Sequence, residues 1–198
     1  HVDASVCDKP FVAGRIDWQQ IAPRDGYTRL ERLMLMAVDN VKHQVAALDF
    51  AGDAVGLILS TTKGNIDLLA QSAMSDKRLF LPELAQRIAT ACGVNTKPIV
   101  ISNACISGVS ALIVAARLIA EGRFRHVLVV GGGLLTQFVV SGFQSFKSVS
   151  ERVCRPYDAA RDGLSMGEAC GAVLLSADRQ FVGNQPVTIV SGAITNDA

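Results

Sequence analysis

Short runs of β-branched and aliphatic residues alternate along this chain with longer stretches in which apolar residues recur at helical spacing. The runs at 54–60, 98–102 and 126–133 are apolar throughout, so they predict strands that are buried on both faces. Between them, helices are expected at 82–92 and 105–121. This alternation predicts an α/β fold in which helices cover both faces of a mostly parallel sheet.

Start and stop signals bound several of the expected helices. Thr28 and Glu31 have the spacing of a capping box, which predicts a helix that runs to about Leu48. Pro82 begins the next helix, and Gly93 follows its end as a C-cap. Segments 1–27 and 147–163 are expected to be irregular, the first with at most one short strand. Segments 65–74 and 136–146 are expected to be helical, and 171–176 and 186–195 are expected to be two strands that pair as a hairpin.

The chain is apolar for its size. Hydrophobic residues make up 49% of it and charged residues only 19%, against about 25% charged in an average domain. Either its elements are buried on both faces, or part of its surface is meant for a partner. A net charge of +1, 6% aromatic residues and no basic stripe exclude a nucleic-acid-binding protein.

An uncharged stretch at 126–146 raises the question of a membrane span. It contains three consecutive glycines from Gly131 and several polar side chains, so we interpret it as a strand, a glycine turn and a buried helix. No signal peptide is expected from the first residues of this sequence. It begins with His1 rather than Met and ends at Ala198 just after an expected strand, so we expect it to be part of a longer protein.

Five scattered cysteines indicate reduced thiols. None forms a pair or a Cys/His cluster with zinc spacing, so no metal site is expected, and a cytoplasmic location is predicted. They are Cys7, Cys92, Cys105, Cys154 and Cys170.

Cys105 is placed where a buried strand gives way to a buried helix. Ligand sites of open α/β sheets collect at that edge, and a helix start offers free amides and a positive dipole end that stabilise a thiolate. Ala104, Ser107 and Gly108 are small and leave room for a substrate beside the sulfur. Two interpretations stay open at this point: a nucleophile, or a small buried hydrophobe.

No histidine is well placed to serve Cys105 as a proton partner. His1 is terminal, His43 is expected on a solvent-facing part of a helix, and His126 opens a strand at the opposite edge of the sheet. A cysteine nucleophile usually needs a histidine. The thiol is therefore not catalytic, or its partners lie outside these 198 residues.

Three segments in order carry a resemblance to a known family. NACISG leads into a long apolar helix, HVLVVGGG follows, and CRPYDAARDGLSMGEACGAVLL comes last. Together, over roughly residues 54–198, they resemble the N-terminal half of a β-ketoacyl-(acyl carrier protein) synthase of the thiolase superfamily. STTKGN and VVSGFQSFKS look most like the subgroup that makes aryl-polyene or flexirubin pigments.

The resemblance implies a thiolase-like layered αβα half, which is one part of a five-layer αβαβα fold. Residues 1–198 would be the N-terminal half, with 1–27 poorly anchored to the family and the C-terminal half absent. It implies that Cys105 carries the growing acyl chain as a thioester. The family's two catalytic histidines and a lysine would lie beyond Ala198.

The resemblance also implies substrates and partners. No bound cofactor is expected, because the acyl groups are carried on the phosphopantetheine of an acyl carrier protein. The carrier would dock on exposed basic residues, for which Lys63, Lys77, Arg78 and Lys147 are candidates. A homodimer or a heterodimer with a related synthase subunit is expected. The family lines its acyl pocket in the region of Phe138, Phe143 and Phe146, although plain core packing would explain them as well.

The chain departs from the family pattern at Cys170, where a small residue is usual and which we interpret as packing. Asp158, Arg161 and Asp162 are expected to fix a loop through hydrogen bonds and ion pairs. Glu168 is expected to have a structural role, with the orientation of a neighbouring active-site loop as the alternative. Three alternative functions remain: a thiolase-type enzyme that uses coenzyme A thioesters, a non-catalytic partner like a chain-length factor, and a nucleotide-binding module suggested by VLVVGGG. The last lacks the G-x-G-x-x-G spacing.

Overall fold

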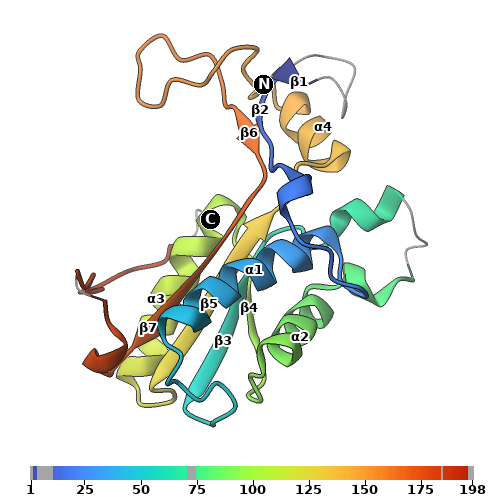
Figure 1. Ribbon diagram of the computed structural model, residues 1–198. Helices are drawn as coiled ribbons and strands as arrows, with labels where there is room; N and C mark the ends of the chain where they lie inside the picture. The colour runs from blue at the N-terminus through green and yellow to red at the C-terminus, as the bar shows by residue number, and fades with distance from the viewer. Residues whose placement is uncertain (1, 4–10, 71–74, 184, 196–198) are drawn as a thin grey trace.

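The computed structural model of the protein describes residues 2–3, 11–70, 75–183 and 185–195 (Figure 1). Its main sheet has the strand order β4-β3-β5-β7. The first three strands are parallel and the last is antiparallel to β5, which confirms the prediction of a mostly parallel sheet. The strands are β3 (Val55–Ser60), β4 (Ile99–Ile101), β5 (His126–Gly133) and β7 (Ala169–Ser176).

Helices cover both faces of this sheet. Helices α1 (Arg29–Gln44) and α2 (Leu81–Cys92) lie on one face, and α3 (Ser107–Ala120) lies on the other (Figure 1). Short 3₁₀ turns connect the larger elements in the described parts of the chain: η1 (Trp18–Gln20), η2 (Ile66–Ala70), η3 (Lys77–Leu79), η4 (Ala104–Ile106) and η5 (Arg179–Phe181).

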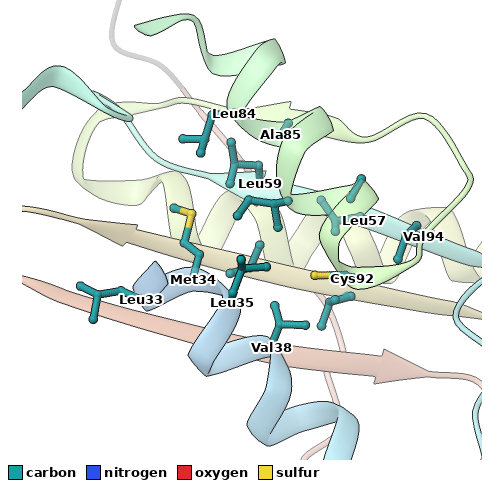
Figure 2. Close-up of a cluster of buried hydrophobic side chains, with 14 of the residues drawn as sticks. Leu33, Met34, Leu35, Val38, Leu57, Leu59, Leu84, Ala85, Cys92 and Val94 are labelled. Carbon is teal, nitrogen blue, oxygen red and sulfur yellow. The ribbon is translucent and has the colours of Figure 1, made fainter. Parts of the chain in front are cut away.

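Alternating side chains of β3 supply both layers of the core. Leu57 and Leu59 point into the cluster under α1 and α2, whereas Ile58 points into the cluster under α3. All six residues of β3 are buried, as expected for a central strand covered on both faces. Figure 2 shows the first cluster, in which Met34 and Leu84 of the two helices meet Leu59 of the sheet.

The local helix signals are confirmed. Thr28 and Glu31 form the capping box at the start of α1, and the buried Glu31 carboxylate also pairs with Arg87 of α2, with an Nε–Oε1 distance of 2.8 Å. Gly93 ends α2 in the left-handed region with φ 74°. Helix α1 stops at Gln44, earlier than predicted, because the backbone of Val45 leaves the helical conformation.

A second, smaller sheet lies beyond the end of the main one. It has the order β1-β2-β6, with β1 (Val2–Asp3) antiparallel and β6 (Met166–Gly167) parallel to β2 (Phe11–Gly14). Helix α4 (Gln137–Ser145) packs beside it, through a small cluster of buried residues formed by Phe11, Ala13, Leu135 and Val140. The region 1–27 thus contains two short strands where at most one was predicted.

Residues 186–195 do not form the predicted strand, and the predicted hairpin is wrong. β7 pairs with β5, and the 186–195 segment is not in a strand. The segment runs along α3, where Arg117 donates a hydrogen bond to the Gly192 carbonyl at 3.0 Å. Val187 and Val190 are about nine-tenths exposed, so the β-branched pattern here does not mark a buried strand.

The uncharged stretch at 126–146 contains the predicted strand and helix, β5 and α4. The predicted glycine turn is wrong, because Gly131–Gly133 belong to β5 and the turn is at 134–136, and α4 is not a buried helix, since Val140 is its one buried residue. Across the described parts of the chain, no helix is both long enough and apolar enough to cross a bilayer. The helix predicted at 65–74 is a 3₁₀ turn over Ile66–Ala70, and residues 71–74 lie outside the described residues.

Candidate active site

Three parallel strands end at one edge of the main sheet. β4 and β5 are both paired in parallel with β3, so Ser60, Ile101 and Gly133 all lie toward the same edge. Loops at the carboxyl ends of parallel strands are where open α/β sheets bind ligands. The segment after β4 brings Cys105 to this edge within four residues.

A tight turn places Cys105 between β4 and α3. Ala104 has φ 42°, which is unusual for a residue with a Cβ. The Ser107 hydroxyl holds this turn: it accepts a hydrogen bond from the Asn103 amide at 2.8 Å and donates one to the Ala104 carbonyl at 2.7 Å. Backbone strain of this kind is retained where the surroundings impose it, which is common at functional sites.

The prediction that Cys105 is accessible is confirmed. The residue is exposed, in the 3₁₀ turn η4 that leads directly into the fourteen-residue helix α3. The first amides of a helix have no partner within the helix, and they make its start electropositive. Cys105 therefore lies beside a helix start at the ligand-binding edge of the sheet.

A hollow of about 510 Å³ opens on the α3 side of the sheet, beside this turn. Ala104, Ser107 and Gly108 line it from the turn, and Ser60 and Gly131 line it from the ends of β3 and β5. A Cβ added at Gly131 would lie 2.8 Å from the Ser60 carbonyl oxygen, so only glycine fits this part of the wall. Cys105 itself does not line the hollow, but its neighbours Ala104 and Ser107 do.

The other described cysteines differ from Cys105. Cys92 is buried in the core, and burial raises the pKa of its thiol to about 11. Burial likewise raises the pKa of the Cys170 thiol to about 12, and its Sγ donates to the Gly131 carbonyl at 3.0 Å, so its assignment to packing agrees with the structure. Hydrogen bonds with Ser165 lower the pKa of the half-buried Cys154. Cys7 lies outside the described residues.

Neither of the two described histidines is near Cys105. His43 is exposed in the last turn of α1, as predicted. His126 is buried at the start of β5, opposite the edge that holds Cys105, with its Nδ1 3.0 Å from Ser176 Oγ. Burial is the main reason that the pKa of His126 is lowered. His1 lies outside the described residues. No group of three or more potential metal ligands occurs among the residues that the structure describes.

The structure does not bring the three candidate pocket phenylalanines to the hollow beside Cys105. Phe138 is 55% exposed and lines a separate groove of about 320 Å³ between α4 and η2. Phe143 is partly buried on α4, and Phe146 at the end of α4 is 80% exposed. The described hollow beside the Cys105 turn is therefore lined without the aromatic residues of α4.

The loop after α4 is fastened by its own polar side chains, as predicted. Asp162 pairs with Arg152 and accepts a hydrogen bond from the Ser150 hydroxyl at 2.9 Å. These two contacts lower the pKa of the Asp162 carboxyl. Asp158 accepts a hydrogen bond from the Ala160 amide at 2.7 Å, and Arg161 donates to the Asp158 carbonyl.

Sequence reasoning missed the role of Ser107. It was noted only as a small residue near the sulfur, yet its hydroxyl closes the turn that presents Cys105. The one available signal was its position, two residues after the cysteine at a helix start, where serine hydroxyls often bond to nearby backbone.

The sheet topology and the position of Cys105 define an α/β protein with an exposed thiol at the carboxyl edge of a mostly parallel sheet, and comparisons with known proteins identify the family. A model of the β-ketoacyl synthase N-terminal domain matches residues 23–180. The chain belongs to the β-ketoacyl synthase family and corresponds to its N-terminal domain. The expected resemblance is thereby confirmed.

Individual relatives are similar to this chain over part of their length. The 3-oxoacyl-[acyl-carrier-protein] synthase 2 of Vibrio harveyi is 30% identical over 142 residues, which are 61% of this chain and 34% of that protein. A ketosynthase in complex with its chain length factor from Xenorhabdus doucetiae has a TM-score of 0.71 at 23% identity, over 86% of this chain and 48% of that one. A β-ketoacyl synthase from Burkholderia phymatum has a TM-score of 0.66 at 20% identity, over 80% of this chain and 46% of that one. The chain thus spans about half of these solved structures and a third or less of the curated relatives.

Proposed function

We propose that the protein carrying this chain catalyses a decarboxylative condensation: an acyl group held on Cys105 joins a malonyl unit on acyl carrier protein to give a 3-oxoacyl product. One observation carries the proposal: in a chain of the β-ketoacyl synthase family, Cys105 is exposed on a fixed turn at the ligand-binding edge of the sheet. The product would serve fatty acid, polyketide or polyene synthesis.

In the first step, the Cys105 thiolate attacks the carbonyl carbon of an acyl thioester on the phosphopantetheine arm of the carrier. The carrier thiolate leaves, takes a proton, and the acyl group stays on the Cys105 sulfur. The Cys105 amide, at the helix start, would donate to the oxyanion that forms in this step. Ser107 would keep that amide and the sulfur in place through the turn.

In the second step, malonyl thioester loses carbon dioxide, and the resulting enolate attacks the carbonyl carbon of the Cys105 thioester. The new carbon–carbon bond forms as the Cys105 thiolate leaves. Groups that stabilise the enolate would come from the family's histidines and lysine, which we expect beyond Ala198. The 198 residues alone should therefore not complete the condensation.

Partners follow from the same chemistry. The acyl carrier protein would be acidic and would dock on exposed basic side chains near the entrance. Among the candidates, Lys63 Nζ lies 5.8 Å from the centre of the Phe138 ring, whereas Arg78 is paired with Asp76. Solved ketosynthases that match this fold occur with a chain length factor, which favours a heterodimer with a related subunit over a homodimer.

Acyl transfer to a single cysteine tests the proposal. The full-length protein, with its partner subunit, is incubated with acyl-loaded carrier protein, and the mass of each cysteine peptide is measured. We expect the acyl group on Cys105, its loss in Cys105→Ala, and normal loading in Cys154→Ala, a matched control because Cys154 is also a partly accessible thiol.

Two results would contradict the proposal. An acyl group on a cysteine other than Cys105 would refute the assigned nucleophile, and no acylation at all would favour the partner-subunit role. Loading from acyl coenzyme A in preference to acyl carrier protein would favour the thiolase-type alternative.

A further inference from the structure

The peptide group that joins Ala104 to Cys105 is held by hydrogen bonds at its carbonyl end. The Ala104 carbonyl accepts one from the Ser107 hydroxyl at 2.7 Å and another from the Ser107 amide. A carbonyl oxygen has two lone pairs, so one residue supplies a donor to each of them. Ser107 is only 5% exposed, and water therefore competes little for these bonds.

The Ser107 hydroxyl is itself held in one orientation. It accepts a hydrogen bond from the Asn103 amide at 2.8 Å while it donates to the Ala104 carbonyl. A hydroxyl has a single proton to donate, and here the Asn103 amide occupies its acceptor side. The side chain thus connects both ends of the turn in which Ala104 has φ 42°, a conformation that must be imposed on a residue with a Cβ.

The direction of the Ala104 carbonyl decides the direction of the Cys105 N–H. The peptide group is planar and trans, so its carbonyl and the N–H of the following residue point in opposite directions. Ser107 therefore sets where the Cys105 N–H points without bonding to it. Among the described residues, no hydrogen-bond acceptor takes up the Cys105 amide, which leaves this donor for a ligand.

Two donors on the carbonyl also strengthen the N–H at the other end of the peptide group. Hydrogen bonds that share a peptide group polarise one another, and the effect is larger away from water. A donor stabilises a developing oxyanion most when its direction is fixed before the reaction begins. The Cys105 amide meets this requirement beside the hollow that Ala104 and Ser107 line.

We propose that Ser107 is a positioning residue for the oxyanion: by holding the Ala104 carbonyl, it orients the Cys105 N–H toward the oxygen that becomes negative during acyl transfer. This inference rests on the proposed condensing function. It assigns Ser107 an effect on reactions of the Cys105 sulfur at a carbonyl carbon, and little effect on other reactions of the same sulfur.

Two reagents that react with the same thiolate separate this role from a general role in the turn. With p-nitrophenyl butyrate, the thiolate attacks the ester carbonyl carbon, an oxyanion forms, p-nitrophenolate leaves, and the butyryl group stays on the sulfur. With iodoacetamide, the sulfur displaces iodide and no oxyanion forms. The full-length protein with its partner subunit is treated with each reagent, and peptide mass mapping gives the two rates at Cys105. Exposure and pKa of the thiol affect both rates, so their ratio reports on the oxyanion.

The ratio of ester to iodoacetamide rates should fall about tenfold in Ser107→Ala, because a misdirected amide loses part of the roughly 100-fold or greater effect of an oxyanion donor. Ser107→Thr keeps the hydroxyl and should retain the wild-type ratio. Ser110→Ala is the matched control: Ser110 is 2% exposed on the same helix, and its hydroxyl has no partner among the described residues, so the ratio should not change. If Ser107→Ala does not fold, Ser107→Gly, which also lacks the hydroxyl, is measured in its place.

Equal falls of both rates in Ser107→Ala would leave Ser107 a structural residue of the turn, and unchanged rates would show that the turn does not need it. Either result overturns the proposal, as does a wild-type ratio no higher than that of glutathione, whose thiol has no oriented amide beside it. If acyl carrier protein does not load Cys105 while the ester ratios are as expected, the proposed function is overturned and the role of Ser107 stands.

Discussion

The two faces of the main sheet are covered very differently. On the α1 and α2 side, Leu57 and Leu59 are buried in a large cluster closed by both helices (Figure 2). On the α3 side the cluster is smaller, Val109 of α3 is 62% exposed and Val173 of β7 is 50% exposed. The hollow beside Cys105 opens on this second side. The face under α1 and α2 therefore contains the larger part of the buried core, and the proposed active site lies on the face under α3.

Substitutions of core residues should give the largest difference in the free energy of unfolding between the two faces. Leu57→Ala should lower the free energy of unfolding by about 3 kcal/mol, since Leu57 is almost fully buried and leaves a cavity. Val173→Ala on the open face should cost less than about 1 kcal/mol. Urea denaturation of both variants measures the difference. Equal costs in the full-length protein would show that more chain covers the α3 face.

The reactivity of cysteine thiols should also differ between the two faces of the sheet. At pH 8 a thiol with pKa about 11, such as Cys92, is only about 0.1% thiolate, and its burial also blocks the reagent, whereas Cys105 is exposed. Iodoacetamide should therefore label Cys105 in the native protein, and label Cys92 and Cys170 only after denaturation. Peptide mass mapping gives the rates. Native labelling of Cys170 at the rate of Cys105 would show that the closed face opens readily.

The same raised pKa values predict how stability depends on alkaline pH. The unfolded chain loses these thiol protons near pH 9, while the native protein keeps them to about pH 11 for Cys92 and about pH 12 for Cys170. The free energy of unfolding should therefore fall as the pH rises above about 9. Cys92→Ala and Cys170→Ala should each flatten the curve, and an unchanged slope in both would contradict this account.

The smallest predicted effect on the free energy of unfolding comes from His126, which lies at the end of the sheet opposite Cys105. Burial lowers its pKa below 6.5, and Arg125 adds to this while Asp178 opposes it. The unfolded chain therefore takes up a proton at higher pH than the native protein does, and the free energy of unfolding should fall as the pH drops below about 6.5. His126→Gln should remove this component from a denaturation series over pH. The same slope in the variant would assign the acid sensitivity to other groups.

Local signals predicted the elements that depend on near neighbours. The Thr28 and Glu31 capping box and the Gly93 C-cap needed only residues within one turn of their helix ends, so spacing alone was sufficient. The strand predicted at 186–195 rested on β-branched composition alone; the segment instead lies beside α3 with Val187 and Val190 exposed, although β7 is an edge strand of the main sheet.

The position of Cys105 could be predicted because strand ends and helix starts are visible in the sequence. The hydrogen bonds that Glu168 accepts from Ile16 and Trp18 agree with the structural role expected of it, but these partners could not be predicted, because they are separated from it by about 150 residues and nothing in the local pattern links them. The aromatic residues of α4 show the same limit: helical spacing placed Phe138 and Phe143 on one helix but not the groove that Phe138 lines.

Trp18 has a practical value that follows from its place in the structure. It is the single tryptophan of the chain, it is bonded to Glu168, and the Arg29 guanidinium lies 4.1 Å above its ring. Within these 198 residues tryptophan emission therefore comes from one known location, and loosening of the contact between Trp18 and Glu168 would shift that signal. This part of the protein thus contains its own optical reporter for the segment that leads into α1.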